Sequence, residues 1–383
     1  MMEIDPLPKR YVKGVCMTKF GLDDRTTMDL SYEAISGVLD DAQTSLNDIE
    51  AAVISTVDTK VNDERQRHYP PLLASMLRKK IPIIRVPAVC GGGGAAFWSA
   101  LRLKYNNILI LAVDHVLSAP TSMITKEIMN ASENFWEQEE GLNFPAINAL
   151  VAQQHFNKYG TTHEDLELVS FKNHHHGSLN PKARFYGKMV TMEDIRKAPI
   201  VASPFTLYDC SISVNGAAAA IISKDKTDIE VKASTLSSDY IAPFEREDMT
   251  IWTGTVNAGK AAFAQAGINP LDVNVAELHD AFTIIELIAY EDLGWCKKGQ
   301  SKKLIRDGFT NLDGNIPVNT SGGLKAKGHP ISPTGMAQIV EIYDQLQGRC
   351  QDRQVDNPKY GLTHNVGGPG GTTTVHIFRK IGG

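Results

Sequence analysis

The feature that most constrains the fold is an internal repeat. Residues 39–54 and 263–278 align without a gap, and each segment reads as a helix, a turn containing an aspartate, and an apolar strand. The first half ends in a further apolar strand at 108–113, which resembles the closing strand at 372–378. Alternating helices and strands predict mostly parallel sheets with helices outside, and the repeat predicts two similar α/β halves.

The two copies are separated by an irregular segment rich in aromatic, histidine and proline residues. We therefore divide the 383 residues into an N-terminal half (1–117), an insert that completes it (118–225) and a C-terminal half (226–383). Active sites in α/β folds lie at the carboxyl ends of strands, where the turns converge. We expect one site that draws on turns from both halves.

Composition excludes several classes of function. A net charge of −5 argues against a general nucleic-acid or membrane-surface binder. The longest apolar runs, at 108–113 and 217–222, are too short to span a bilayer, and we expect no apolar leader segment. The five cysteines form no Cys-x-x-Cys pair, which fits a reducing cytoplasm better than a disulfide framework or a zinc site.

One cysteine stands in a sharp strand-to-helix turn. Cys90 follows the apolar run 83–89, and glycines 91–94 lead into an Ala/Leu-rich run that predicts a helix. At a helix N-terminus the dipole favours the nucleophilic thiolate, and free amides of the turn can bind an oxyanion. A buried structural cysteine beside a tight turn is the alternative interpretation.

Two histidines occupy turns of the second half. His279 follows the predicted strand 275–278, although a lone histidine there is more often structural. His329 lies in a Gly-His-Pro corner between a predicted strand running into a double glycine, 317–323, and a helix over 336–346. Pro330 restricts the backbone of His329, so its ring is held in place and can take a proton from a thiol and return it.

A glycine-rich segment, 364–371, precedes the final strand. Its amides are also suited to holding an oxyanion. Tight turns that need a positive φ explain any one of these loops taken alone.

Together these motifs resemble the thiolase superfamily. The resemblance rests on Gly322-Gly323 followed by Gly328-His329-Pro330, on the closing Gly367-Gly368-x-Gly370, and on the His-Asp-x-Phe motif His279–Phe282. That last motif is typical of the archaeal and sterol-carrier-protein-type thiolases. The resemblance covers essentially the whole chain. It implies an α/β thiolase fold, a five-layered αβαβα domain from two similar halves, in a homodimer or homotetramer.

The resemblance also implies a role for each site residue. Cys90 would be the acylated nucleophile and His329 its activating partner. His279 would hold, through a water, the carbonyl oxygen of a second thioester. The amides of Cys90 and Gly367 would bind the oxygen of the acyl-enzyme.

Two departures leave the base for the carbon acid unassigned. Asn365 stands where thiolases usually carry a second cysteine, and Ala281 stands where sterol-carrier-type enzymes can restore it. Neither side chain can accept a proton. We expect His329 to act as this base while His279 binds the enolate oxygen. Two further departures, Ser332-Pro333 after the Gly-His-Pro corner and Asp114 after the strand 108–113, also alter the usual pattern.

The implied activity is that of an acetyl-CoA C-acetyltransferase, which condenses two acetyl-CoA or runs in reverse. Coenzyme A thioesters would be the substrates, with no other cofactor, and the product would feed mevalonate synthesis in an archaeon. Archaeal relatives suggest a complex with hydroxymethylglutaryl-CoA synthase through a small OB-fold/zinc-ribbon protein. The alternatives are a thiolase-like acyltransferase or aldolase with a different acceptor, and a weakly catalytic scaffold subunit.

Other polar residues invite weaker interpretations. The run His174–His176 suggests a metal site, but we expect none, because neighbouring side chains diverge. Several basic residues are possible anchors for the coenzyme A phosphates: Lys182, Arg184, Lys188, Lys325 and Lys327. Exposed lysines more often only solvate a surface.

Overall fold

The computed structural model describes residues 7–22, 24–57, 64, 66–116 and 121–382. The strands are β1 (Tyr11–Met17), β2 (Ala51–Ser55), β3 (Ile83–Arg85), β4 (Ile108–Asp114), β5 (Ile200–Ala202), β6 (Phe205–Thr206), β7 (Gly216–Ser223), β8 (Ile229–Ser238), β9 (Val275–Leu278), β10 (Tyr360–Gly367) and β11 (Thr372–Lys380). The α-helices are α1 (Thr27–Asp41), α2 (Tyr69–Leu77), α3 (Gly92–Ala100), α4 (Thr121–Ile128), α5 (Phe144–Tyr159), α6 (His163–Ser178), α7 (Met192–Arg196), α8 (Thr253–Ala266), α9 (Thr283–Asp292), α10 (Ser301–Arg306), α11 (Gly323–Ala326) and α12 (Pro333–Gln347).

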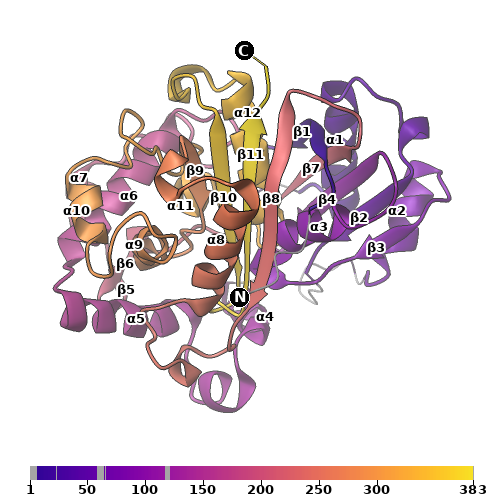
Figure 1. Cartoon of the computed structure of the whole chain (residues 1–383). Coiled ribbons are helices and arrows are strands. Elements are labelled where there is room, and N and C mark those ends of the chain that lie inside the picture. Colours follow the sequence, from indigo (N-terminus) through magenta and orange to yellow (C-terminus); the bar gives the residue numbers. More distant parts are fainter. Residues whose placement is uncertain (1–6, 23, 58–63, 65, 117–120, 383) are drawn as a thin grey trace.

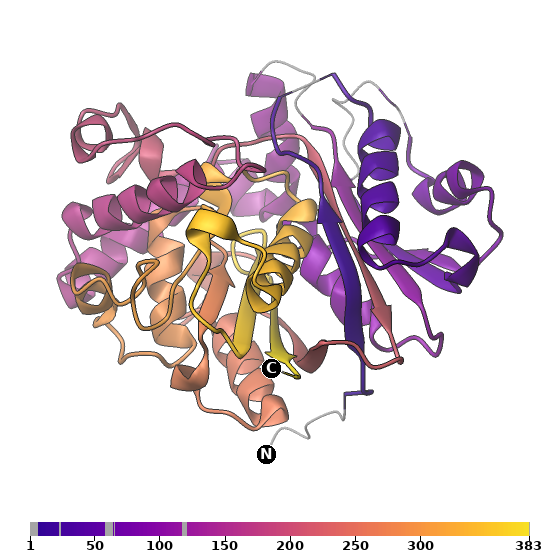
Figure 2. The same cartoon turned by 90° about the horizontal axis from the view of Figure 1, so that it is seen from above.

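The main sheet has the strand order β3-β2-β4-β7-β1-β8-β11-β10-β9. Its two parts meet where β1 pairs with β8, through Tyr11 with Glu230 and Val12 with Ile229. Helices α1 and α2 cover the outside of one part, and α8 and α9 cover the outside of the other (Figures 1 and 2). Helices α3 and α12 pack between the two parts and contact strands of both. The predicted five-layered αβαβα arrangement is confirmed.

The prediction of mostly parallel sheets is wrong. Parallel pairing is found within β3-β2-β4 and between β10 and β9, whereas β1, β7, β8 and β11 pair antiparallel with their neighbours. The connection between β10 and β11 covers only residues 368–371, which is too short for the crossover that a parallel pair needs. Strand β10 extends to Gly367, so residues 364–367, which were predicted to lie in a loop, belong to the strand.

The strand predicted to begin at 317 is reduced to one bridge, in which Val318 pairs with Ala276 of β9. Asn319 has a φ of 56°, which ends the extended conformation there. Its side-chain oxygen instead accepts a hydrogen bond from the amide of Leu278 at 2.8 Å. The bend starts the loop that carries His329.

The two repeat copies form equivalent units of helix, short 3₁₀ turn and strand: α1 with β2, and α8 with β9. In the first turn the Asp48 carboxylate accepts from the amide of Ser45 at 3.0 Å. In the second, Asp272 accepts from the amide of Asn269 at 2.7 Å. The aspartate of the sequence repeat is therefore a capping residue in both halves.

Glycines allow α3 and α12 to cross closely in the middle layer. A Cβ on Gly93 would lie 2.5 Å from the Met336 amide nitrogen, and a Cβ on Gly335 would lie 2.5 Å from that of Gly94. Real Cβ atoms do not approach backbone so closely, so larger residues would force the helices apart. The N-terminal ends of both helices thereby meet at one place.

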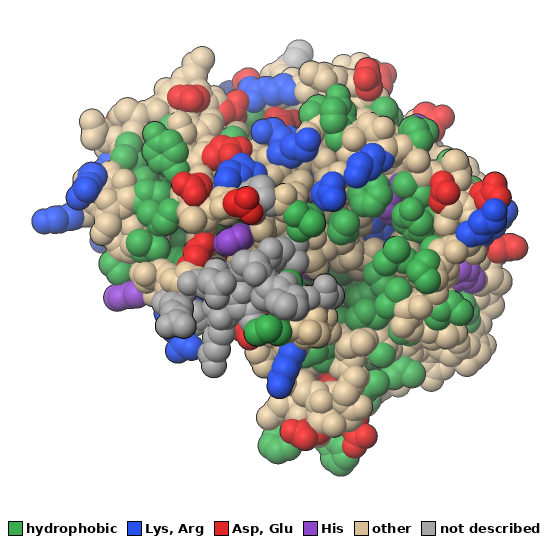
Figure 3. Space-filling view, turned by 180° about the vertical axis from the view of Figure 1, so that it is seen from behind, with side chains coloured by type: hydrophobic (Ala, Val, Ile, Leu, Met, Phe, Trp, Pro, Cys, Tyr) green, Lys and Arg blue, Asp and Glu red, His purple; other side chains and the backbone are tan. Residues whose placement is uncertain are grey.

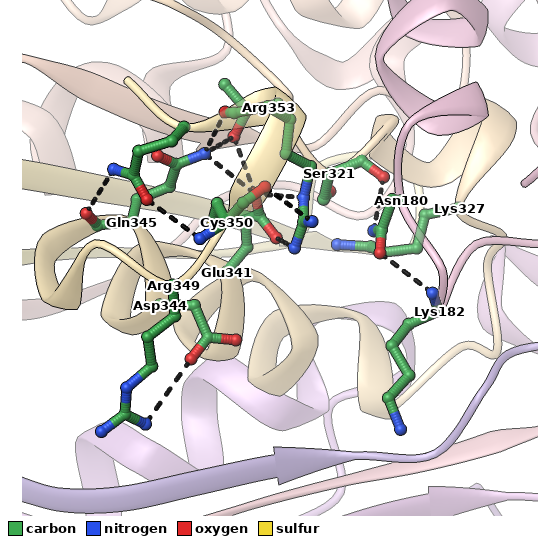
Figure 4. A network of polar contacts seen from close by, with 12 residues as sticks. Asn180, Lys182, Ser321, Lys327, Glu341, Asp344, Gln345, Arg349, Cys350 and Arg353 are labelled. Atoms are coloured by element: carbon green, nitrogen blue, oxygen red, sulfur yellow. Dashed lines mark hydrogen bonds and ion pairs between the residues drawn. The ribbon is translucent and has the colours of Figure 1, made fainter. Parts of the chain in front are cut away.

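A buried ionic network fixes the loop that leads to His329 (Figure 4). Glu341 of α12 accepts from Arg353 Nε and Nη2 at 3.1 and 3.0 Å, and from Thr320 Oγ1 at 3.0 Å. In the same loop, Lys327 lies 3.3 Å from Glu277 of β9. The loop is thus attached to both α12 and β9.

Replacing Glu341 with leucine is expected to lower the free energy of unfolding by about 3–5 kcal/mol, because Arg353 would stay buried without its counterion. Urea denaturation followed by circular dichroism measures the change. Arg349→Gln is the matched control: this arginine pairs with Asp41 and is 44% exposed, so about 1 kcal/mol or less is expected. Equal losses in the two variants would contradict the prediction.

Charge on the surface is mixed. Outside the grey region, basic and acidic side chains lie interspersed with apolar ones on the face seen in Figure 3. In the part of the chain that the structure describes, no helix combines the length and apolar character needed to cross a membrane.

Candidate active site

Cys90 lies in a strained turn between β3 and α3. It is the middle residue of a 3₁₀ turn, Val89–Gly91, that runs directly into α3. Val89 has a φ of 48°, a left-handed conformation that costs free energy for a β-branched residue. The turn holds Cys90 at the N-terminus of a buried helix with part of its surface still accessible.

A cavity of about 170 Å³ brings Cys90, His279 and His329 together. These residues come from both halves, as expected for one shared site. The insert supplies much of the remaining wall: Thr125, Ile128, Met129, Phe144, Pro145, Asn148, Cys210, Ser211 and Ser213. Ala281, Phe282, Ile285 and Gly368 complete the lining.

Two effects act in opposite directions on the thiol of Cys90: the N-terminus of α3 favours the thiolate, and burial of the side chain disfavours it. Burial raises the pKa of the Cys90 thiol to about 12, although the amides of Gly368 and of Cys90 itself oppose the shift. Asp114 raises the pKa further through its negative charge. The resting group is a thiol, so reaction requires a neighbour that takes its proton.

The backbone and side chain of His329 are both held by hydrogen bonds. Its amide donates to the Ile212 carbonyl at 2.8 Å, and its Nδ1 lies 2.7 Å from Thr334 Oγ1 at the start of α12. Burial lowers the pKa of His329 to about 4. The imidazole is therefore neutral near pH 7 and can accept a proton.

Replacing His329 with alanine is expected to slow the alkylation of Cys90 by iodoacetamide at pH 7 about tenfold, because the thiol loses its proton acceptor. In the wild type the rate should fall as the pH approaches 4, since protonated His329 cannot act as a base. Mass spectrometry of the Cys90 peptide measures the rate. His175→Ala is the control, because His175 is exposed and does not line the cavity. An unchanged rate and pH profile in His329→Ala would remove His329 from this role.

Asn365 fixes the hydrogen-bonding state of His279. Its Oδ1 faces the amide of Gly94 at 3.3 Å and its Nδ2 faces the carbonyl of Cys90 at 3.0 Å, so the two backbone groups determine the amide orientation. The same Nδ2 lies 3.4 Å from Nδ1 of His279. His279 thus accepts at Nδ1 and carries its proton on Nε2, where it can donate.

His279 and His329 face each other across the site. Their rings pack edge to face with centroids 5.6 Å apart. Burial lowers the pKa of His279 well below its usual value, and His329 and His364 add to this shift. Two neutral imidazoles can therefore lie side by side without mutual repulsion.

The closing glycine segment contacts the nucleophile turn. A Cβ on Gly367 would lie 2.6 Å from the Ala88 carbonyl oxygen, so only glycine fits there. The amide of Gly368, one residue beyond the predicted Gly367, is the one that contacts the Cys90 sulfur. An oxyanion role for the Gly367 amide stays a prediction.

Asp114 has a role that the sequence did not indicate. Its buried carboxyl accepts from Thr56 Oγ1 at 2.9 Å and from the amides of Val57 and Ser332 at 2.7 Å each. Ile331 between His329 and Ser332 has a φ of 66°. Asp114 therefore secures the strained turn from His329 into α12, which begins at Pro333. Its position at the end of β4 was the available signal.

Two of the suggested coenzyme A anchors are ruled out by burial. Lys325 and Lys327 are each 1% exposed. Lys325 donates to the Asp209 carbonyl, and Lys327 pairs with Glu277. By contrast, Arg184 and Lys188 line a separate basic pocket together with Lys19 and Arg25. Lys182, two residues before Arg184, is exposed.

The histidine run has structural partners. His174 Nδ1 donates to the Ser170 carbonyl at 2.8 Å, and His176 Nδ1 donates to the Asn319 carbonyl at 3.1 Å. His175 is exposed. Among the described residues, no group of three potential metal ligands is found.

Comparisons with known proteins place these features in context. The family model "Thiolase C-terminal domain-like" matches residues 236–380. The acetyl-CoA acetyltransferase of Methanothermobacter thermautotrophicus is 40% identical, over 96% of this chain and 99% of the relative. Sterol carrier protein 2 of Bos taurus is 31% identical, over 98% of this chain and 73% of the relative.

Solved structures share the fold. The Ltp2-ChsH2(DUF35) aldolase aligns with a TM-score of 0.83 at 24% identity, covering 97% of this chain and 98% of that chain. Acetyl-CoA acetyltransferase from Syntrophomonas wolfei aligns with a TM-score of 0.73 at 17% identity, covering 98% and 100%.

Proposed function

The chain belongs to the thiolase superfamily and is an acyltransferase of that family, and from this membership we propose that it is an acetyl-CoA C-acetyltransferase. It forms acetoacetyl-CoA from two acetyl-CoA through an acyl-enzyme on Cys90, or cleaves acetoacetyl-CoA in reverse. The observation that carries the proposal is the single cavity that joins Cys90, His279 and His329.

In the first step Cys90 attacks the carbonyl carbon of acetyl-CoA. His329 takes the thiol proton on Nε2. This nitrogen is the acceptor in the proposed mechanism because Nδ1 carries the ring proton and donates it to Thr334 Oγ1. The acetyl–sulfur bond to coenzyme A breaks, and His329 returns the proton to the departing coenzyme A thiolate. Amides of the Cys90 turn and of the closing glycine segment stabilise the negative oxygen.

In the second step a further acetyl-CoA loses a methyl proton, and the resulting carbanion attacks the acetyl group on Cys90. The negative charge of the carbanion resides largely on the thioester oxygen. His279 donates to that oxygen from Nε2, the tautomer that Asn365 enforces. Carbon–carbon bond formation then releases Cys90 as a thiolate, which must regain a proton.

The size and lining of the cavity favour a short acyl group. About 170 Å³ is less than the volume typical of pockets for drug-sized ligands. Apolar side chains of Ile128, Met129, Phe144 and Ile285 form part of its lining. An acetyl group fits such a site, whereas a long chain would require these side chains to move.

Incubating the protein with acetyl-CoA tests the proposal directly. The intact mass should increase by one acetyl group, located on Cys90 by peptide mapping, and acetoacetyl-CoA should be cleaved by free coenzyme A. Acetylation confined to Cys16, Cys210, Cys296 or Cys350 would contradict the assignment.

A second candidate is a thiolase-like acyltransferase or aldolase with a different acceptor. It is favoured by Asn365 and Ala281, which cannot serve as the base that an acetyl-CoA acceptor requires. Acetylation of Cys90 without any acetoacetyl-CoA formation or cleavage would support this candidate. A scaffold role is less favoured, because scaffolding alone does not require the three polar groups of the cavity.

The setting of the reaction is part of the same proposal. The acetoacetyl-CoA would supply mevalonate synthesis in the cytoplasm, and the chain would act as a homo-oligomer. A complex with hydroxymethylglutaryl-CoA synthase and a small OB-fold/zinc-ribbon protein would pass the product on. Co-purification of the three proteins from one extract tests that association.

A further inference from the structure

A second thiol lines the cavity that contains the nucleophile. Cys210 is partly exposed there and comes from the insert, directly after a 3₁₀ turn, Leu207–Asp209. Its sulfur lies 3.7 Å from the Thr206 carbonyl oxygen. Among the five cysteines, only Cys90 and Cys210 line this cavity. The sequence-based prediction of the site did not include Cys210.

Backbone hydrogen bonds place Cys210 beside the His279 loop. Cys210 forms an antiparallel bridge with Phe282, and the amide of Ser211 donates to the Ala281 carbonyl at 2.8 Å. The methyl side chain of Ala281 occupies little of the adjacent space. A thiol from the insert therefore stands next to the residue two positions after His279.

A buried cation lies behind Cys210. The ammonium group of Lys325 donates to the carbonyl of Asp209, the residue preceding Cys210. Burial raises the pKa of the Cys210 thiol, and the positive charge of Lys325 opposes this rise; the resulting pKa is about 11. Asp209, Asp280 and Glu286 are the acidic groups near Lys325. A Cys210 thiolate would thus have a fixed counterion, whereas Lys325 has no part in the steps assigned to Cys90.

We infer that Cys210 is the base that removes the methyl proton of the second acetyl-CoA, an inference that rests on the proposed function. The Cys210 thiol first releases its own proton to solvent. The resulting thiolate takes the methyl proton as the carbon–carbon bond forms and the bond between the acetyl group and Cys90 breaks. That proton then passes from Cys210 to the released Cys90 thiolate, and Cys210 regains a proton from solvent, so both residues return to the thiol form. This assignment replaces His329 as the expected base and leaves His329 to serve Cys90 alone.

Hydrogen–deuterium exchange separates this step from acylation. Wild-type protein with acetyl-CoA in D₂O should acetylate Cys90 and introduce deuterium into the methyl group of acetyl-CoA, both measured by mass spectrometry. Cys210→Ser should acetylate Cys90 to the same extent, while deuterium uptake and acetoacetyl-CoA formation fall about 10²-fold, because a hydroxyl is far too weakly acidic to replace the thiolate. Cys296→Ser is the matched control, since Cys296 is a partly buried cysteine outside the cavity.

A rescue variant excludes a merely structural role. Cys210→Ser combined with Ala281→Cys returns a thiol to the same corner and should recover deuterium uptake at least about tenfold over Cys210→Ser. If Cys210→Ser is acetylated on Cys90 and still takes up deuterium at the wild-type rate, the inference is overturned and the proposed function stands. A loss that the second cysteine does not restore would mark Cys210 as structural and would also overturn it. Failure of the wild type to acetylate Cys90 would instead overturn the proposed function.

Discussion

Replacing Cys90 with serine is expected to abolish acetylation and to lower both condensation and cleavage at least about 10³-fold. The acetyl group would have no thiol to attach to, and a hydroxyl is a much weaker nucleophile at the pH where His329 works. Intact mass after incubation with acetyl-CoA and a spectrophotometric assay of acetoacetyl-CoA cleavage measure the two effects. The serine is nearly isosteric, so the strained turn at Val89 should be retained.

Cys16→Ser provides the comparison for that variant. Cys16 is a partly buried thiol of β1 that does not line the cavity, so its replacement should leave acetylation and cleavage unchanged. Equal thermal melting of the two variants would show that the loss is chemical. Residual turnover above one tenth of the wild type in Cys90→Ser would contradict a covalent mechanism at this residue.

Replacing His279 with alanine is expected to lower condensation about 10²–10³-fold while Cys90 is still acetylated. In the proposed mechanism the proton on Nε2 of His279 stabilises the negative charge on the enolate oxygen, and this charge develops only in the second step. The rate of acetylation measured by rapid quench and the rate of acetoacetyl-CoA formation distinguish the steps. Equal losses in both rates would show that His279 supports the whole site instead.

The pH dependence gives a second test of His279. Its imidazole is neutral in the working range, because burial holds its pKa well below the usual value. The condensation rate of His279→Ala should therefore keep the ionisation of the wild-type base. Loss of that ionisation would mean that His279 itself accepts the proton.

Much of the fold could be predicted because local sequence patterns indicate where its helices and strands lie. Apolar periodicity and glycine turns located β2, β4, β9, β11 and the middle helices close to their observed bounds. Strand direction was missed, since it depends on connection length and on which strands become neighbours. The strand predicted before the His329 loop is only a single bridge in the structure. Its extension is prevented by a tertiary contact that the sequence does not reveal, the hydrogen bond from the amide of Leu278 to the side chain of Asn319.

The site divides in the same way. Cys90, His279 and His329 stand in motifs with a local signature, and they line one cavity. Cys210 has no such signature, because a bridge to Phe282 across the fold brings it there. The protonation state of Cys90 could not be predicted from the sequence either. Burial raises the pKa of its thiol and the helix N-terminus lowers it, and the balance depends on how many atoms surround the sulfur in the folded chain.

The close glycine crossing of α3 and α12 has a consequence for how this protein can diverge. The two helices hold Cys90 and the His329 corner in the middle layer, where a Cβ added at Gly93 or Gly335 would collide with the backbone of the other helix. The opposite wall of the cavity belongs to the insert, where α4 and α5 supply apolar side chains that do not take part in that crossing. Mutations can therefore accumulate in the wall and alter which acyl group or acceptor is admitted while the reactive groups stay in register. Laboratory evolution of new substrate scope should accordingly concentrate its libraries on the insert and leave the glycines untouched.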